Sequence, residues 1–113
     1  MMRRGCIYRV RLPGEGKWRP ALIVSPDRRN ERANTVVLVP CSSVLRQGPW
    51  HVPLAKGEGG LSAPSVAKCE NITTLEKVRV DPRPLGGPLA RARLVEIREA
   101  ILRALDYDVT EAD

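Results

Sequence analysis

The chain has 113 residues, a formal net charge of +6 and a sequence pI near 9.8. This length supports one modest hydrophobic core, so we expect residues 1–113 to form a single domain. The charge is uneven, because residues 1–56 carry eleven Lys and Arg against three Asp and Glu, whereas residues 57–113 carry eight against ten. The basic half favours a polyanionic partner, although surface arginine also keeps small proteins soluble.

Composition argues against several classes of protein. Three cysteines without a Cys-x-x-Cys pair, and a single histidine, argue against a zinc site. Each cysteine lies in an apolar or alternating run and is expected to be a small buried hydrophobe. The carboxylates are scattered, which argues against a two-metal nuclease. With no signal peptide or membrane span in the sequence, we expect a soluble cytoplasmic protein that uses no metal and no cofactor.

Residues 1–80 read as short strands joined by turns. Alternation over 6–12 and apolar runs over 21–24 and 35–39 predict three strands. Turn residues at 13–17 and a polar segment at 26–32 are expected to connect them. The remaining segments are predicted as follows: strands at 50–54, 65–69 and 72–74, and a hairpin-like loop at 57–60.

The C-terminal third changes to a helical period. From Leu89 onward, apolar residues recur at spacings of three and four, which predicts a helix packed by one face. That stripe consists of Leu94, Ile97, Ile101, Leu102 and Leu105. Glu99 and Arg103 are expected to form an ion pair one turn apart, and residues 106–113 to be a frayed tail. Several short strands and one packing helix predict a mostly β, α+β fold, as a small barrel or curled sheet.

Two strand ends carry groups that suit a phosphodiester. Arg19 precedes Pro20 at the start of a strand, where a guanidinium can hold a phosphate through two hydrogen bonds, or can simply be solvated. Ser42 and Ser43 follow the next strand. A hydroxyl there either donates to a phosphate oxygen or caps the following turn.

A third spot places a cation beside a carboxylate. On a strand, Lys68 and Glu70 share one face while Cys69 points into the core. Such a pair supplies general acid and base groups, or forms an ordinary salt bridge. Because His51 is the single histidine, a two-histidine ribonuclease mechanism is not available, and attack must come from a group on the substrate, such as the 2′-hydroxyl of RNA. His51 itself is interpreted as structural or as a rim contact.

The segments described above resemble the MazF/PemK/Kid toxin family, in order and with similar spacing over residues 3–105. The resemblance is carried by Arg4-Gly5-x-Ile7-Tyr8, residues 19–26, 35–43, 51–54, 65–70 and 72–77, and the terminal helix. It implies a homodimeric, SH3-like barrel of the CcdB/PemK type with a C-terminal packing helix. It also implies a metal-independent, sequence-specific cleavage of single-stranded RNA to a 2′,3′-cyclic phosphate and a 5′-hydroxyl. The expected protein partner is a cognate antitoxin whose tail occupies the RNA groove.

The resemblance also implies roles for individual residues. The phosphate-binding arginine of the family falls on Arg19, and its hydroxyl falls on Ser42, where threonine is usual. The arginine and aspartate proposed as acid and base in the Kid branch fall on Lys68 and Glu70. The other residues expected to bind RNA are Glu15, Lys17, Trp18, Ser43, Arg46 and His51; Trp18 and Trp50 are expected either to stack on bases or to pack in a core or dimer interface.

The chain departs from the family pattern at two places. Cys6 stands where an acidic residue is usual, and the first loop is short, with its Gly-x-Glu-Gln element reduced to Gly14-Glu15-Gly16. Since that loop covers the active site in the family, its shortening implies an altered sequence preference, a weaker cleavage or binding alone. The alternative functions are therefore a CcdB-like DNA gyrase poison, a nucleic-acid-binding module, and an interaction module with a basic face.

Overall fold

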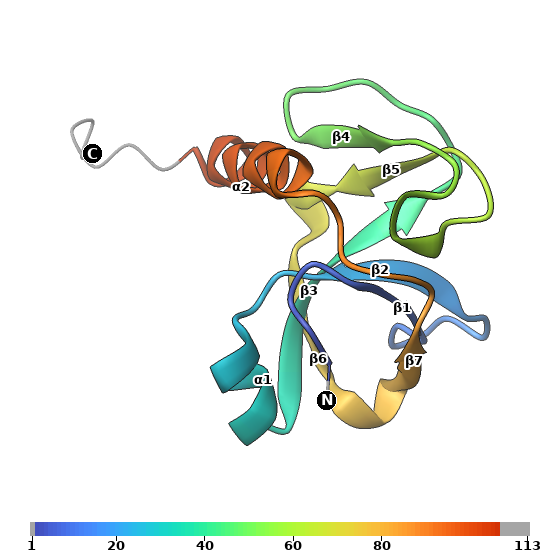
Figure 1. Ribbon diagram of the computed structural model, residues 1–113, viewed down its shortest axis with the longest axis vertical. Helices are drawn as coiled ribbons and strands as arrows, with labels where there is room; N and C mark the ends of the chain where they lie inside the picture. Colours follow the sequence, from blue (N-terminus) through green and yellow to red (C-terminus); the bar gives the residue numbers. More distant parts are fainter. Residues whose placement is uncertain (1, 107–113) are drawn as a thin grey trace.

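A computed structural model describes residues 2–106 (Figure 1). Antiparallel strands form a curled sheet in the order β4-β5-β3-β2-β1-β7, and β6 pairs with β3 beside this path. The strands are β1 (Ile7–Val10), β2 (Arg19–Ile23), β3 (Thr35–Ser42), β4 (His51–Leu54), β5 (Ser65–Lys68), β6 (Thr73–Glu76) and β7 (Val80–Pro84). The helices are α1 (Asp27–Arg32) and α2 (Arg91–Leu105), with 3-10 turns at Glu58–Gly60, Cys69–Asn71 and Lys77–Arg79.

Two clusters of buried side chains cover both faces of the central strands. Ile7 of β1 and Leu22 of β2 are cross-strand partners and belong to one cluster. Their neighbours Tyr8 and Ala21 are also partners and belong to the other. Because successive side chains of a strand point to opposite faces, coverage of both faces explains why β2 reads as a continuous apolar run.

Helix α2 packs across the 3-10 turn at Cys69–Asn71 and against β4 (Figure 1). Ile97 is buried in the first cluster, and Leu94 and Ile101 are partly buried against it, as the stripe predicts. Leu102 and Leu105 are exposed instead, so the stripe narrows toward the end of the helix. The predicted tail begins at Asp106, the C-cap residue of α2, and its remaining residues, 107–113, lie outside the described part of the chain.

The predicted ion pair between Glu99 and Arg103 is wrong. Glu99 pairs with Arg98 at 3.1 Å. Arg103 donates from Nε to the carbonyl oxygen of Pro49 at 2.6 Å, which ties α2 to the segment before β4. A backbone acceptor brought in by the tertiary fold therefore replaces the carboxylate one turn away.

Two further segments differ from the sequence prediction. The polar segment at 26–32 contains helix α1, which is held by buried Asn30, whose Nδ2 donates to the carbonyl of Ser25 at 2.9 Å. No apolar stripe could reveal this short helix. The strand β7 is absent from the sequence prediction; it contains Pro82 and Pro84 and lies at the edge of the sheet, where proline is tolerated.

Candidate active site

A basic cleft of about 390 Å³ lies over β1, β2 and the end of β3. Its charged lining residues are Arg9, Lys17 and Arg19, and no carboxylate is among the residues that line it. The opposite wall comes from the segment 61–65 and from Leu85. A concave surface that is lined by positive charges concentrates anions.

Arg19 opens β2 at this cleft, as the sequence predicts, and is paired with Glu15. Their Nε and Oε1 atoms are 2.9 Å apart, and the side chains are 38% and 35% exposed. The N–H does not point along this line, so the contact is an ion pair, and the buried Nε has no hydrogen-bond acceptor. Glu15 therefore occupies the guanidinium that is predicted to bind phosphate.

Ser42 ends β3 and lines the cleft together with Ser43. The Ser42 Oγ accepts a hydrogen bond from the backbone N–H of Val44 at 3.1 Å, so the capping role that was one of the two alternatives is realised. This bond uses a lone pair of the oxygen and leaves the hydroxyl hydrogen available to donate. Capping and phosphate binding are thus compatible at Ser42.

A second hollow of about 120 Å³ adjoins the cleft at Ser42. Its other polar lining residues are Arg46, His51 and Lys68, and again no carboxylate lines it. His51 of β4 lies directly opposite Lys68 of β5 in the strand pairing. The two hollows share Ser42 and together form a basic surface that includes Arg19, Ser42 and Lys68.

Glu70 does not share a strand face with Lys68, and that prediction is wrong. β5 ends at Lys68, and residues Cys69–Asn71 form a 3-10 turn in which Cys69 is buried, as expected. The turn directs Glu70 toward β4, where its Oε2 lies 2.8 Å from Nε2 of His51. Glu70 lines neither hollow; its carboxylate lies against His51, which lines the second hollow, and 31% of its side chain is exposed.

His51 is held by Glu70 on one side of its ring and packs close to Gly48 on the other. Its side chain is 10% exposed, and Nε2 carries the proton toward Glu70 because a carboxylate can only accept. The buried Nδ1 has no hydrogen-bond partner within residues 2–106, and a Cβ on Gly48 would stand 3.1 Å from it. Sequence spacing could not reveal this pair, because it depends on the pairing of β4 with β5.

The two tryptophans differ in position. Trp18 lines the cleft with 47% of its surface exposed, and the guanidinium of Arg11 lies 5.4 Å from its ring centroid, a cation–π distance. Trp50 is 38% exposed but lines neither hollow. Trp18 is thus the tryptophan placed to stack on a base.

Arg9 is a cation of the cleft lining that the sequence did not single out as a site residue, although the alternation of β1 indicates an exposed side chain there.

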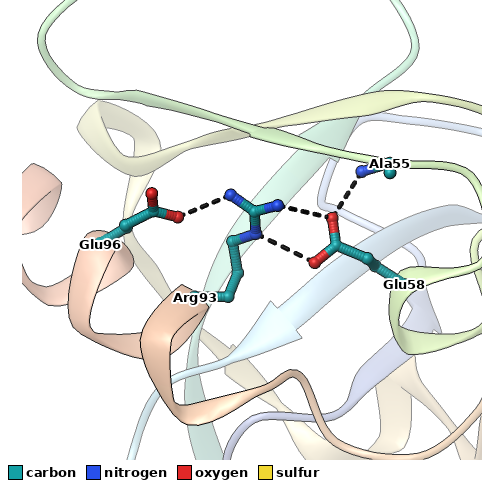
Figure 2. Close-up of polar contacts among 4 residues, drawn as sticks. All are labelled: Ala55, Glu58, Arg93 and Glu96. Carbon is teal, nitrogen blue, oxygen red and sulfur yellow. Dashed lines mark hydrogen bonds and ion pairs between the residues drawn. The ribbon is translucent and has the colours of Figure 1, made fainter.

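The wall opposite the cations is anchored to α2 (Figure 2). Arg93 donates from Nε and Nη2 to the carboxylate of Glu58, both at 3.0 Å, and from Nη1 to Glu96 at 2.6 Å. Glu58 also accepts the N–H of Ala55 at 2.6 Å. These contacts, Arg93 foremost, hold the pKa of Glu58 below its ordinary value. The expected hairpin-like loop is a 3-10 turn fixed in this way just before the wall begins at Leu61.

Close backbone packing holds the same turn from its other side. A Cβ on Gly60, whose φ is +87°, would meet the carbonyl oxygen of Leu85 at 2.2 Å. Glycine is therefore required there by both conformation and space. Leu61 and Leu85, which both line the cleft, are fixed relative to each other by this contact.

Thiol and metal chemistry find no support at the site. Burial raises the pKa of Cys41, at the cleft floor, to about 12 and that of Cys69 to about 11, so both thiols stay protonated at neutral pH. Cys6 is buried too, as predicted. Within the described residues, no group of three or more His, Cys, Asp or Glu side chains could hold a metal ion.

No helix in residues 2–106 is both long and apolar enough to cross a membrane.

Known sequences are similar to most of this chain. The family described as PemK-like, MazF-like toxin of type II toxin-antitoxin system matches residues 3–105. Endoribonuclease MazF9 of Mycobacterium tuberculosis is 34% identical, over 94% of this chain and 98% of its own length. Endoribonuclease MazF of Staphylococcus saprophyticus is 32% identical, over 71% of this chain and 72% of its own length.

Solved structures share the fold. The Mycobacterium tuberculosis toxin MazF-mt6 has a TM-score of 0.80 at 28% identity, covering 91% of this chain and 98% of its own. A mycobacterial endoribonuclease in complex with its cognate antitoxin has a TM-score of 0.81 at 29% identity, covering 96% and 98%. The fold is thus that of the small barrel-like toxins with a C-terminal helix, as predicted. The chain belongs to the PemK/MazF family of type II toxins.

Proposed function

We propose that this chain is a toxin endoribonuclease that cleaves single-stranded RNA without a metal ion. The observation that carries the proposal is the basic surface made of two hollows that share Ser42, one lined by Arg19 and the other by Lys68, with no carboxylate lining either. Family membership and the relatives named endoribonucleases support the same class of activity. RNA is the favoured substrate because its 2′-hydroxyl supplies the nucleophile that the chain lacks.

The scissile phosphate binds at Ser42, where the two hollows meet. Arg19 approaches it from the β2 side and Lys68 from the β5 side, while the Ser42 hydroxyl donates to a non-bridging oxygen. Two cations and a donor fixed on strands stabilise the charge that builds up on the phosphorane oxygens. A phosphate at the Arg19 guanidinium competes with the Glu15 carboxylate that lies beside it.

Proton transfer falls to Glu70 and Lys68. As the 2′-oxygen bonds to phosphorus and the bond from phosphorus to the 5′-oxygen breaks, Glu70 takes the 2′-hydroxyl proton and the Lys68 ammonium protonates the leaving oxygen. The products are a 2′,3′-cyclic phosphate and a 5′-hydroxyl. In this scheme His51 orients Glu70 through the 2.8 Å contact and is a positioning residue.

The remaining RNA contacts follow from the lining of the hollows. Trp18 stacks on a base with its free face, while Lys17 and Ser43 contact the backbone in the cleft. Arg46 contacts the backbone at the second hollow, where His51 forms part of the wall.

The proposed protein partners are a cognate antitoxin and a second copy of the chain. A similar solved structure holds an endoribonuclease with its cognate antitoxin, which supports the first. Exposed Val44 and Leu45, beside the second hollow, offer an apolar anchor to such a partner. An antitoxin segment with carboxylates would compete with RNA for the same cations.

The proposal is tested by the chemistry of cleavage. Purified protein is incubated in excess EDTA with a long single-stranded RNA, and the ends are mapped. We expect discrete cuts with cyclic phosphate and 5′-hydroxyl ends. A 2′-deoxy substitution at the mapped position should abolish the cut there. Intact RNA at high protein concentration would contradict the nuclease and favour binding alone or a gyrase poison.

A further inference from the structure

Arg9 is a cleft cation that the mechanism above does not use. It lies in β1 as the exposed residue between buried Tyr8 and Val10. It lines the same cleft as Arg19 and Ser42. Its guanidinium forms no ion pair with a carboxylate of residues 2–106, in contrast to the pairing of Arg19 with Glu15.

Strand order places Arg9 at one end of the basic surface. β1 is followed across the sheet by β2, β3 and β5. Arg9 is the cross-strand partner of Pro20, so both side chains lie on one face, and both line the cleft. Arg9 lines only the larger hollow, Lys68 lines only the smaller one, and Ser42 lines both.

The scissile phosphate already has its partners, which leaves Arg9 for another anion. In the proposed function Arg19, Ser42 and Lys68 hold the scissile phosphate, whereas Arg9, on β1, lines the larger hollow and has no role there. In a single-stranded nucleic acid the next anion along the chain is the adjacent backbone phosphate. Small side chains on the facing wall, Ser62 and Ala63 among them, leave the cleft open to a backbone.

We propose that Arg9 binds a second backbone phosphate of the RNA, next to the scissile phosphate on the β1 side. This inference rests on the proposed function and extends it, because it gives the bound strand a direction across the sheet. A contact of this kind adds affinity and register without reading bases.

The test compares Arg9→Gln with Arg32→Gln as a matched control. Arg32 is exposed and lies in α1, just before the start of β3. Ser42 is at the other end of β3, and the strand is about 23 Å long. Binding is measured by fluorescence anisotropy over a salt series, with RNA carrying a 2′-deoxy sugar at the mapped cut. Each phosphate contact on a single strand contributes about 0.7 to the slope of log affinity against log salt. We expect Arg9→Gln to reduce the slope by about that amount and Arg32→Gln to leave it unchanged.

Stepwise shortening of the RNA separates a local contact from a general charge effect. Nucleotides are removed one at a time from each end, and the parent is compared with Arg9→Gln at each length. We expect the difference between them to disappear at one defined length from one end only, when the phosphate bound by Arg9 is gone. Cut positions on long RNA should be the same for both proteins.

The outcomes distinguish this inference from the proposed function. Suppose that the parent cleaves RNA. If Arg9→Gln then keeps the parental salt slope, or reduces it no more than Arg32→Gln does, the proposed role of Arg9 is wrong. A difference that persists at every RNA length overturns it as well. A parent that binds RNA without cleaving it contradicts the nuclease proposal; salt slopes on unmodified RNA then decide whether Arg9 contacts a phosphate. A parent that binds no RNA overturns both.

Discussion

Glu15 and His51 are the residues whose side chains change the chemistry of the site most. Glu15 holds Arg19 at 2.9 Å, and His51 holds Glu70 at 2.8 Å. Two of the predicted RNA-binding residues are therefore each paired with a predicted catalytic residue. In the first pair Glu15 competes with the phosphate for Arg19, whereas the second pair can persist during the reaction.

Replacing Glu15 with Gln is expected to tighten RNA binding. The guanidinium of Arg19 would then meet the phosphate without displacing a carboxylate. Because the ion pair is more than a third exposed, we expect a gain of no more than about fivefold, equivalent to about 1 kcal/mol. Titration of a labelled, cleavage-resistant RNA measures it. Weaker binding by the variant would show instead that Glu15 contacts the RNA directly.

Replacing Glu70 with Gln is expected to slow cleavage by at least about a hundredfold, in the range of losing a general base. The amide can still accept the His51 N–H, so the melting temperature should stay close to that of the parent. Single-turnover cleavage and thermal unfolding of the same samples provide the two readouts. Cleavage at the parental rate would remove Glu70 from the mechanism.

The element that shapes the cleft wall is the 3-10 turn at Glu58–Gly60. It is clamped to α2 by Arg93 and packed on the backbone at Leu85 (Figure 2). The clamp joins segments 35 residues apart in sequence. It therefore couples the stability of α2 to the shape of the RNA site.

Replacing Glu58 with Gln is expected to lower the free energy of unfolding by about 1 kcal/mol, allowing for partial solvent screening of the pair. The effect should depend on pH in one direction. Arg93 holds the folded-state pKa of Glu58 below its ordinary 4.5, so the stabilisation is fully present above pH 4.5 and disappears as the pH falls through the lowered value. Urea unfolding of parent and variant from pH 3 to 7 measures the difference. A difference that grows in acid would contradict the clamp.

An element could be predicted from the sequence where the spacing of its own apolar residues indicates a strand or a helix. β1 to β6 and α2 follow from alternation and helical spacing, which the sequence carries directly. Helix α1 has no apolar stripe, and β7 contains two prolines, so both depend on tertiary contacts. The site follows the same rule, because Arg19 and Ser42 are at strand ends, as predicted, whereas the Glu70–His51 pair requires the β4–β5 ladder.

At the scale of the whole molecule, the family and the barrel-like fold predicted from the sequence are confirmed. Part of the excess positive charge of residues 1–56 lies at the proposed RNA site. Arg9, Lys17, Arg19 and Arg46 of the basic half line the two hollows, and Lys68 joins them from β5. An arrangement of this kind steers a polyanion to the place where the proposed chemistry occurs.

Dimerisation is the expected state of the free protein. The 12.5 kDa chain should sediment at twice its own mass at micromolar concentration. Sedimentation equilibrium over a range of concentrations measures this state. A single species at the mass of one chain would contradict the homodimer and place a complete RNA site within one copy.

The central claim is that Arg19 stabilises the phosphate during a metal-independent cleavage of RNA. The direct measurement is the single-turnover rate on a mapped RNA site in excess EDTA, for the parent, Arg19→Ala and the control Arg32→Ala. We predict that Arg19→Ala loses at least about a hundredfold in rate, as expected for removal of one preorganised donor, while Arg32→Ala cleaves like the parent. Cleavage by Arg19→Ala at the parental rate would contradict the account.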